Sequence, residues 1–389
     1  GGAICIDFGS AYTKVAFRST DTAKGQLILD LPSAQQDREL GMGFCVPTVV
    51  AERRRGGRTT FAYGDAAASV LPGDGVEVYR NWKPKLLSVP QGMTSLGSSW
   101  RDVGTEFFKS LREDVRNKLS RRASRLGDWD VRVCIPRVEG IDDYCARQAI
   151  TNVLISSEWI DKRYRDSLDT IVYEPVANAW GIITEGVNRP GIDGAKYNLR
   201  QMVQGSRVQR AFARAHVTGQ KDFRFPLLVV DVGAYTTDCG LLPIDWSFID
   251  NDDLEVIHRS YEMGVKELDA MIFRNAPEEG QSAIASLNTQ DWEGLKTRLY
   301  GGHPVKVSHT LNGKAVTTTI KASGVGSMIK AFASGVVDCV QRFAAHHMDG
   351  ITVQEVILTG GGMRIPEVAA ALVDAVNRKK IPGLSAVSY

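Results

Sequence analysis

Three short segments combine an apolar run, a glycine-containing turn and side chains that can bind phosphate or metal. They are Ile4–Lys14, Leu227–Asp238 and Val356–Pro366. In the first two, an aspartate closes the apolar run and a glycine follows two positions later, at Asp7 and Gly9 and again at Asp231 and Gly233. Carboxylates beside turns with exposed backbone N–H groups favour a polyphosphate bound together with a hydrated Mg²⁺ ion.

The first segment predicts a β-hairpin whose turn binds phosphate. Ile4–Ile6 is apolar in succession, which predicts a strand buried on both faces. Gly9 has no side chain, so backbone N–H groups there can approach a phosphate closely, and Ser10 adds a hydroxyl donor. Lys14 supplies a point charge for the phosphates. A single Asp-x-Gly turn is also ordinary turn chemistry, so the prediction depends on its repetition.

The other two segments complete the pattern. Asp231, Gly233 and Asp238 repeat the strand, turn and strand of the first segment. In the third, Gly360–Gly362 follows an apolar strand and precedes a helix start, which lets the backbone lie against a flat ligand. The chain has no G-x-x-x-x-G-K-[ST] segment, so its sequence does not support a P-loop; Gly313 with Asn312 instead predicts a hairpin turn.

The three segments resemble the first phosphate, second phosphate and adenosine motifs of the actin, sugar-kinase and heat-shock chaperone ATPase superfamily. The nearest resemblance is to the nucleotide-binding domain of DnaK-type heat-shock chaperones, and it spans nearly the whole chain. Further segments that agree in order are Tyr63–Ala67, Val131–Pro136, Glu174–Ala177, Met263–Asp269 and the pair Glu293 and Lys296. The resemblance implies an α/β, two-lobed actin-like ATPase fold, in which each lobe is a mixed β-sheet flanked by helices with small inserted subdomains.

The resemblance also implies roles for individual residues around ATP or ADP and Mg²⁺. Glu174, with Asp238, would position the attacking water, Lys14 would neutralise charge, and the metal would be held by Asp7 and Asp231. The implied nucleotide-binding residues are Gly9, Ser10, Ala11, Tyr12, Gly233, Ala234, Tyr235, Thr236, Gly264, Lys266, Glu293, Lys296, Gly360, Gly361, Gly362 and Arg364. The chaperones also use a lysine of the small subdomain of the first lobe, for which Lys83 and Lys85 are the counterparts here.

Simpler interpretations of two of these features remain open. Glu174 is also what a helix N-terminus favours, because its charge complements the helix dipole. Glu293 and Lys296 are also spaced as a surface i,i+3 pair, which contributes little to stability.

The second phosphate turn departs from the chaperone pattern. The chaperones carry three successive glycines there, whereas this chain has Gly233, Ala234 and Tyr235. The bulk of a tyrosine there predicts impaired phosphate approach or slow hydrolysis.

The expected domain organisation follows the same resemblance. Lobe I covers about residues 1–180 with a small subdomain at about 44–100, and lobe II covers about 181–389 with a small subdomain at about 264–325. A basic insertion lies at about 185–226, and its middle, Leu199–Ala215, predicts a helix. This insertion either docks a partner, RNA or an acidic surface, or is inert, and loop tolerance favours the inert interpretation. The chain ends where the chaperone pattern opens its last helix, which is expected of either a fragment or a stand-alone nucleotide-binding unit.

Composition narrows the function classes. The net charge of +2 over 389 residues gives no reason to expect nucleic acid as a partner, and no apolar run reaches a membrane-spanning length. Six scattered cysteines without a C-x-x-C motif favour reduced thiols and a cytoplasmic location. The expected function is a chaperone-like nucleotide switch that hydrolyses ATP and changes lobe closure for a protein partner or client. A small-molecule kinase and an actin-like filament protein are the alternatives, and the oligomeric state stays open.

Overall fold

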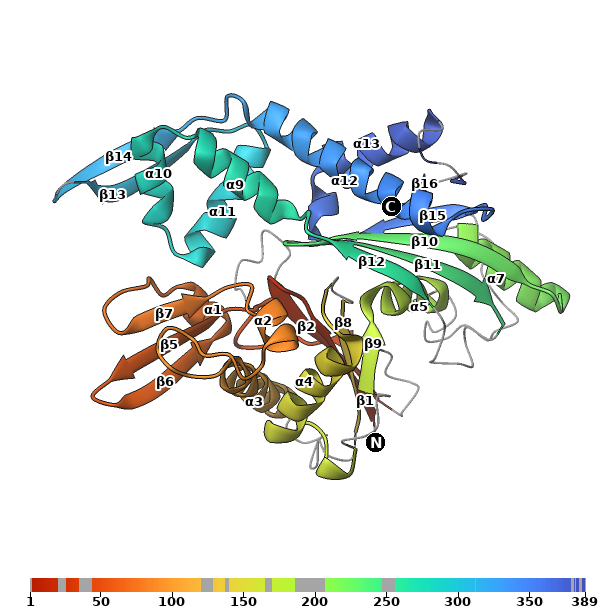
Figure 1. Cartoon of the computed structure of the whole chain (residues 1–389), viewed down its shortest axis with the longest axis horizontal. Coiled ribbons are helices and arrows are strands. Elements are labelled where there is room, and N and C mark those ends of the chain that lie inside the picture. Colours follow the sequence, from red (N-terminus) through yellow and green to blue (C-terminus); the bar gives the residue numbers. More distant parts are fainter. Residues whose placement is uncertain are drawn as a thin grey trace.

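The structure is a mixed α/β arrangement of sheets flanked by helices (Figure 1), which confirms the predicted fold class at this level. It is a computed structural model that describes residues 2–19, 26–34, 44–119, 129–136, 140–164, 170–185, 207–246, 256–311, 313–378, 381, 383–384 and 387–388. The part of the predicted basic helix before residue 207, and Asn312 of the predicted hairpin, lie outside these ranges.

The first large sheet is built from the N-terminal part of the chain. Its strand order is β3-β2-β1-β8-β9, with β4 pairing on β2. The pairs β1–β2 and β2–β3 are antiparallel, whereas β1–β8 and β8–β9 are parallel. The strands are β1 (Gly2–Phe8), β2 (Tyr12–Ser19), β3 (Gln26–Ile28), β4 (Val46–Pro47), β8 (Asp130–Ile135) and β9 (Ile171–Tyr173).

The second large sheet repeats this plan in the C-terminal part of the chain. Its order is β12-β11-β10-β15-β16, and its pairs are again antiparallel, antiparallel, parallel and parallel along that order. The strands are β10 (Arg224–Val232), β11 (Thr237–Asp245), β12 (Ile257–Tyr261), β15 (Glu355–Thr359) and β16 (Val387–Ser388). Strands β1 and β10 therefore hold the same central place, each followed by a hairpin partner.

Helices cover these sheets and form separate hydrophobic cores. In the first half, α3 (Trp100–Leu119) and α4 (Asp143–Ser156) pack in a core with β1 and β8. Helix α3 carries apolar residues at helical spacing on the face that it turns to this core, and all of them are buried: Val103, Phe107, Phe108, Leu111, Val115 and Leu119. In the second half, α12 (Val325–His347) and α13 (Pro366–Asn377) cover one face of the sheet, and α5 (Glu174–Glu185) with α7 (Arg207–Thr218) covers the other.

Two smaller units extend from the sheets on the same side of the molecule (Figure 1). The first contains β5 (Val50–Arg55), β6 (Arg58–Tyr63), β7 (Val76–Tyr79), α1 (Gly64–Ala68) and α2 (Lys83–Ser88). The second contains α9 (Val265–Asn275), α10 (Glu278–Ala285), α11 (Thr289–Tyr300), β13 (Val305–Leu311) and β14 (Lys314–Ile320). The Asn288 side-chain amide donates to the Ser69 carbonyl oxygen at 3.3 Å, so the two units touch. The short 3₁₀ helices are η3 (Lys162–Tyr164) and η5 (Gly361–Arg364).

One sequence prediction about local structure is wrong. Strand β1 is not buried evenly on both faces: Ile4, Ile6 and Phe8 are fully buried in the first core, whereas Cys5 and Asp7 between them are only partly buried. The described part of the basic insertion packs on the second sheet. Helix α7 contributes buried residues, among them Val208 and Phe212, to the core there, so it is part of the fold.

In the part of the chain that the structure describes, no helix combines the length and the apolar character that crossing a bilayer requires.

Candidate functional site

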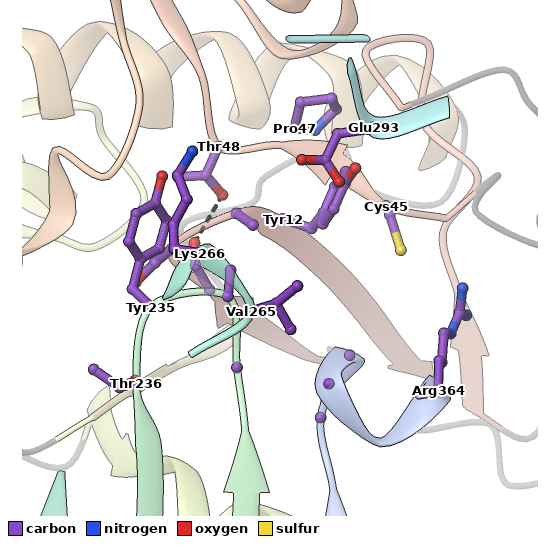
Figure 2. A pocket seen from close by; sticks show the side chains of 18 of the residues that line it. Tyr12, Cys45, Pro47, Thr48, Tyr235, Thr236, Val265, Lys266, Glu293 and Arg364 are labelled. Atoms are coloured by element: carbon purple, nitrogen blue, oxygen red, sulfur yellow. Dashed lines mark hydrogen bonds between the residues drawn. The ribbon is translucent and has the colours of Figure 1, made fainter. Parts of the chain in front are cut away.

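A single cavity of about 870 Å³ is lined by residues from both large sheets and from both small units. The turns that follow β1 and β10, and the glycines that follow β15, all border it (Figure 2). Every residue assigned to the site from the sequence lines this cavity except Gly264 and Lys85, one of the two lysines named as counterparts. Segments that are separated by more than two hundred residues in the chain are therefore brought to one place.

The two hairpins that border the cavity match in register. Asp7 pairs with Lys14 in the first hairpin, and Asp231 pairs with Asp238 in the second. In each case the aspartate is the next-to-last residue of the strand, and its partner follows it by the same number of residues. The difference is one of charge, because the position of Lys14 is occupied by Asp238 in the second hairpin.

Glycines bring the backbone of these turns close together. A Cβ atom on Gly9 would lie 2.4 Å from the Tyr12 carbonyl oxygen, and Gly233 N–H donates to the Thr236 carbonyl oxygen at 2.8 Å. Gly360 has a φ of +93°, and a Cβ there would lie 2.2 Å from Asp231 Oδ1. A Cβ on Gly361, in contrast, would meet no atom within 4 Å. Gly360 therefore packs on β10, while Gly361 leaves open space in the cavity.

Tyr235 fits its turn without backbone strain. Among the described residues other than glycine, only Asn81 and Glu158 have a positive φ, so Ala234 and Tyr235 do not need glycine's conformational freedom. The Lys266 ammonium lies 5.7 Å from the centre of the Tyr235 ring, and both side chains border the cavity (Figure 2). The backbone of this turn therefore accommodates a tyrosine, and what remains of the prediction is that the bulk of the Tyr235 ring impairs the approach of a phosphate.

Gly264 positions the second turn rather than lining the cavity. A Cβ atom on this residue would lie 2.4 Å from backbone atoms of Tyr235. The N–H groups of Val265 and Lys266 donate to the carbonyl oxygens of Gly233 and Ala234, at 3.1 and 2.8 Å. The start of α9 is thus held directly against the turn, which places Lys266 at the cavity.

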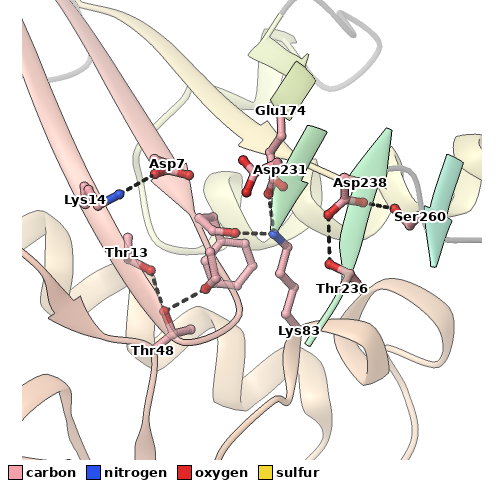
Figure 3. A network of polar contacts seen from close by, with 12 residues as sticks. Asp7, Thr13, Lys14, Thr48, Lys83, Glu174, Asp231, Thr236, Asp238 and Ser260 are labelled. Carbon is pink, nitrogen blue, oxygen red and sulfur yellow. Dashed lines mark hydrogen bonds and ion pairs between the residues drawn. The ribbon is translucent and has the colours of Figure 1, made fainter. Parts of the chain in front are cut away.

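Buried carboxylates gather where β9 meets α5 and where β10 and β11 meet (Figure 3). Burial, together with the charge of Glu174, raises the pKa of Asp231 to about 7, although a 2.9 Å hydrogen bond from the Asn178 amide opposes the rise. Burial and Glu174 likewise raise the pKa of Asp238 to about 7. Asp238 accepts hydrogen bonds from Ser260 and, at 2.8 Å, from Thr236 Oγ1.

Lys83 is the cation that contacts this group of carboxylates. Its Nζ lies 2.9 Å from Glu174 Oε1 and also donates to the Phe8 carbonyl oxygen, and its side chain is only 2% exposed. Burial raises the pKa of Glu174, and the charge of Lys83 opposes that rise. Glu174 is therefore more than a helix-terminal charge. Lys85 differs, because its ammonium lies 4.7 Å from the centre of the Trp100 ring.

Lys14 borders the cavity in a more open position. Its Nζ lies 3.3 Å from Asp7 Oδ2, and both side chains are about half exposed, at 48% and 46%. Beneath them, Thr48 Oγ1 donates to the Gly9 carbonyl oxygen at 2.8 Å and lies 2.9 Å from Thr13 Oγ1 (Figure 3). The first hairpin thus presents a compensated ion pair to the cavity.

A second ionic group borders the cavity on α9 and α11. Lys296 Nζ lies 2.7 Å from Glu293 Oε1 and 3.3 Å from Asp269 Oδ2, and its side chain is 13% exposed. The hydroxyl of Tyr300 donates to Asp269. Glu293 and Lys296 are therefore not an isolated surface pair. Burial and the nearby charge of Glu293 also raise the pKa of Tyr12, which belongs to the first hairpin (Figure 2).

The cavity does not contain a ready-made direct metal centre within the described ranges. No group of three or more histidine, cysteine, aspartate or glutamate side chains there is arranged to hold a metal ion. The carboxylates of Asp7, Glu174 and Asp231 nevertheless interact, since the first two raise the pKa of the third. This arrangement suits an ion that keeps its waters, as Mg²⁺ does, better than one that needs several direct protein ligands.

Asn178 and Asp269 are among the residues of the site that were not assigned to it from the sequence. Asn178, which binds Asp231, lies four residues after Glu174 on α5, and i,i+4 spacing places both on one helix face. Asp269 ends the Met263–Asp269 segment and accepts hydrogen bonds from Trp292 and Tyr300. Helical spacing from an assigned residue is therefore the signal that was available for Asn178.

Comparison with known proteins adds no relative to this picture. No protein-family model matches the chain, and no curated protein matches it.

Proposed function

We propose that this chain binds ATP with Mg²⁺ in the cavity and hydrolyses it. We also propose that its fold is a two-lobed actin-like ATPase fold, with one lobe built on each large sheet. The repeated strand order and orientation of the two sheets support this assignment. The small units of the two halves are then the inserted subdomains of the two lobes.

The observation that carries the proposal is the pair of hairpin turns that face one cavity in the same register. Each turn offers backbone N–H groups at a glycine and a carboxylate at the strand end, at Gly9 and Asp7 and at Gly233 and Asp231. Such turns form concave sites for anions. Two of them on opposite sides of a cavity suit a chain of phosphates better than a single phosphate.

The remainder of the nucleotide is assigned to the part of the cavity that is lined by η5 and α11. Gly361 leaves open space beside η5, where the flat base and sugar can lie against backbone. Glu293 and Lys296 are buried enough to offer oriented donors and acceptors to ribose or base. Arg364 borders the same region, and its planar guanidinium can stack on the base (Figure 2).

Asp7 and Asp231 are the residues that would hold hydrated Mg²⁺. When bound, the ion supplies positive charge that offsets the phosphates and the surrounding carboxylates. The raised pKa of Asp231 supports a cation there, because a cation removes the penalty for ionising a carboxylate in a poorly solvated place. Contacts through water agree with the lack of a direct three-ligand group in the described residues.

Hydrolysis is assigned to Glu174 and Lys83 rather than to Lys14. Burial raises the pKa of Glu174 toward the range in which a carboxylate can accept a proton from an attacking water. Lys83 contacts Glu174 directly and is held by the Phe8 carbonyl oxygen, so it can orient that carboxylate and add charge beside the phosphates. Lys14 remains available to the phosphates from the more open side.

The hydrolysis cycle would act as a switch through the contacts between the two halves. Asn288 and Ser69 join the small units directly, and Tyr12 and Glu293 approach each other from opposite sides of the cavity. A ligand that binds both sides changes how far they close. We propose that a protein partner or client responds to this closure.

The test is Mg·ATP binding by isothermal titration calorimetry. Asp7→Asn and Asp231→Asn are expected to weaken binding at least about tenfold, or about 1.4 kcal/mol each. Asp349→Asn, at an exposed position outside the cavity, is the matched control and should bind as the wild type does. Unchanged affinity in both cavity variants would overturn the site. Phosphate release from ATP without a second substrate separates an ATPase from a small-molecule kinase.

A further inference from the structure

Two thiols lie side by side on the wall of the cavity. Cys5 Sγ and Cys134 Sγ are 3.8 Å apart, and both residues border the cavity. Both are free cysteines; Cys5 is partly exposed and Cys134 is buried. The proposed nucleotide chemistry does not use either thiol.

The strand register places this thiol pair next to Asp7. In the parallel ladder of β1 and β8, Cys5 is opposite Arg132, and Asp7 is opposite Cys134. Cys5 and Asp7 are two residues apart on one strand, so they project from the same face of the sheet. The two sulfur atoms therefore approach each other diagonally across the ladder, with the Asp7 carboxylate beside them.

We propose that Cys5 and Cys134 are an oxidation site, at which a hydroperoxide entering the cavity converts the two thiols into a disulfide. The sulfur of Cys5, the more exposed residue, attacks the peroxide oxygen, which breaks the O–O bond and gives a sulfenic acid and water or an alcohol. The sulfur of Cys134 then attacks that of Cys5 and displaces a second water. The two thiols lose two electrons and two protons in total, and the hydroperoxide is reduced.

Closing this bond moves the residues around it. A disulfide is about 2.05 Å long, so the sulfur atoms must approach by about 1.8 Å. The two side chains, and with them the strands β1 and β8 that carry them, have to shift to allow that approach. The displacement falls on the strand segment that carries Asp7. Oxidation is therefore expected to disturb Asp7, and reduction by a thiol is expected to restore it.

The effect of oxidation on the ligand rests on the proposed function, whereas formation of the bond does not. A bound nucleotide with its metal would fill the space beside Asp7 and shield both thiols. Mg·ATP is therefore expected to slow oxidation, and the oxidised protein is expected to lose Mg·ATP binding. Added dithiothreitol should restore that binding.

The experiment treats the reduced chain with hydrogen peroxide and maps its peptides by mass spectrometry without reduction. The expected product is a cross-linked peptide that contains Cys5 and Cys134 and has lost two hydrogens. Cys5→Ala and Cys134→Ala should each abolish this product. Cys145→Ala, which removes an exposed thiol outside the cavity, should not change it.

Two outcomes overturn the inference. One is a sulfenic or sulfinic acid on Cys5 while Cys134 stays a free thiol. The other is a cross-link of either residue to a different cysteine. Because peptide mapping of the wild-type chain needs neither ATP nor a variant, it decides the matter even if the alanine variants fail to fold. If the cross-link forms and ATP binding is absent from the reduced protein as well, the oxidation site stands and the proposed function fails.

Discussion

Replacing Asp231 by asparagine should stabilise the ligand-free protein while weakening its binding of Mg·ATP. Asp231 is held among carboxylates, and burial together with Glu174 raises its pKa from 3.8 to about 7. Asparagine has the same shape and no charge, and its side-chain oxygen can still accept the hydrogen bond that Asn178 donates. The substitution therefore removes the cost of the charge while keeping the contact.

The magnitude follows from the pKa and depends on pH. The native state holds the Asp231 proton more tightly than the unfolded chain does, so the wild type loses stability as pH rises from about 4 to about 7. At about 1.4 kcal/mol per pKa unit, the full cost is about 4 kcal/mol at pH 8 and about 2 kcal/mol at pH 5. Water in the cavity screens part of the charge, so we expect the variant to gain about 2–4 kcal/mol at pH 8. The gain should be about half as large at pH 5.

Urea unfolding at pH 5, 6, 7 and 8 measures this gain as a change in the free energy of unfolding. Asp349→Asn, at an exposed position, is the control and should show neither a gain nor a dependence on pH. A gain for Asp231→Asn that is equal at pH 5 and pH 8 would refute the electrostatic reasoning. So would a loss of stability at pH 8, since it would mean that the ionised carboxylate stabilises the empty site.

Three further predictions concern the same cavity. Lys83→Met should lower kcat for ATP hydrolysis at least about a hundredfold, measured by phosphate release, because Glu174 loses its cationic partner; an unchanged kcat would remove Lys83 from the mechanism. Gly360→Ala should lower the free energy of unfolding in urea by more than about 2 kcal/mol, since its Cβ would collide with Asp231. Gly361→Ala should lower it by less than about 1 kcal/mol, and equal losses in the two variants would contradict this difference in packing. Binding of Mg·ATP should release protons near pH 7 and tighten as pH rises, because the cation ionises carboxylates whose pKa values are about 7. Calorimetric binding enthalpies measured in buffers of different ionisation enthalpy should therefore differ. Equal enthalpies would exclude proton release.

The sequence predicted those parts of the structure whose signal is local. An apolar run followed by Asp-x-Gly marks a strand and its turn, and this identified both hairpins and the residues at their tips. The turns also predicted which residues line the cavity, because residues at the carboxyl ends of neighbouring strands lie at the same edge of a sheet.

The features that the sequence did not predict depend on contacts between distant residues. Lys83 and Glu174 are separated by 91 residues, and nothing near Lys83 distinguishes it from Lys85 until the fold places one on Glu174 and the other on Trp100. Strand β1 was predicted to be buried on both faces because Cys5 is apolar by type. Whether the Cys5 thiol faces a core or a cavity depends on which side chains pack against that face of β1. Those side chains belong to residues far away in the sequence.

The two hairpins differ in charge in a way that bears on where a metal would bind. In the first, Asp7 is offset by Lys14, which occupies the paired position. In the second, that position holds Asp238, so Asp231 has a carboxylate instead of a cation as its partner in the ladder. Both carboxylates of the second hairpin have pKa values of about 7, and Asp238 accepts hydrogen bonds from the hydroxyls of Thr236 and Ser260.

An arrangement of this kind is costly for the empty protein, because buried carboxylates without a cation favour protonation over ionisation. A bound divalent cation favours the ionised carboxylates instead, and its attraction to them then contributes to binding affinity. The first hairpin, with its own lysine, is better suited to anionic phosphates. If Mg·ATP binds as proposed, its metal should therefore depend more on the second hairpin than on the first, and Asp231→Asn should weaken binding more than Asp7→Asn does.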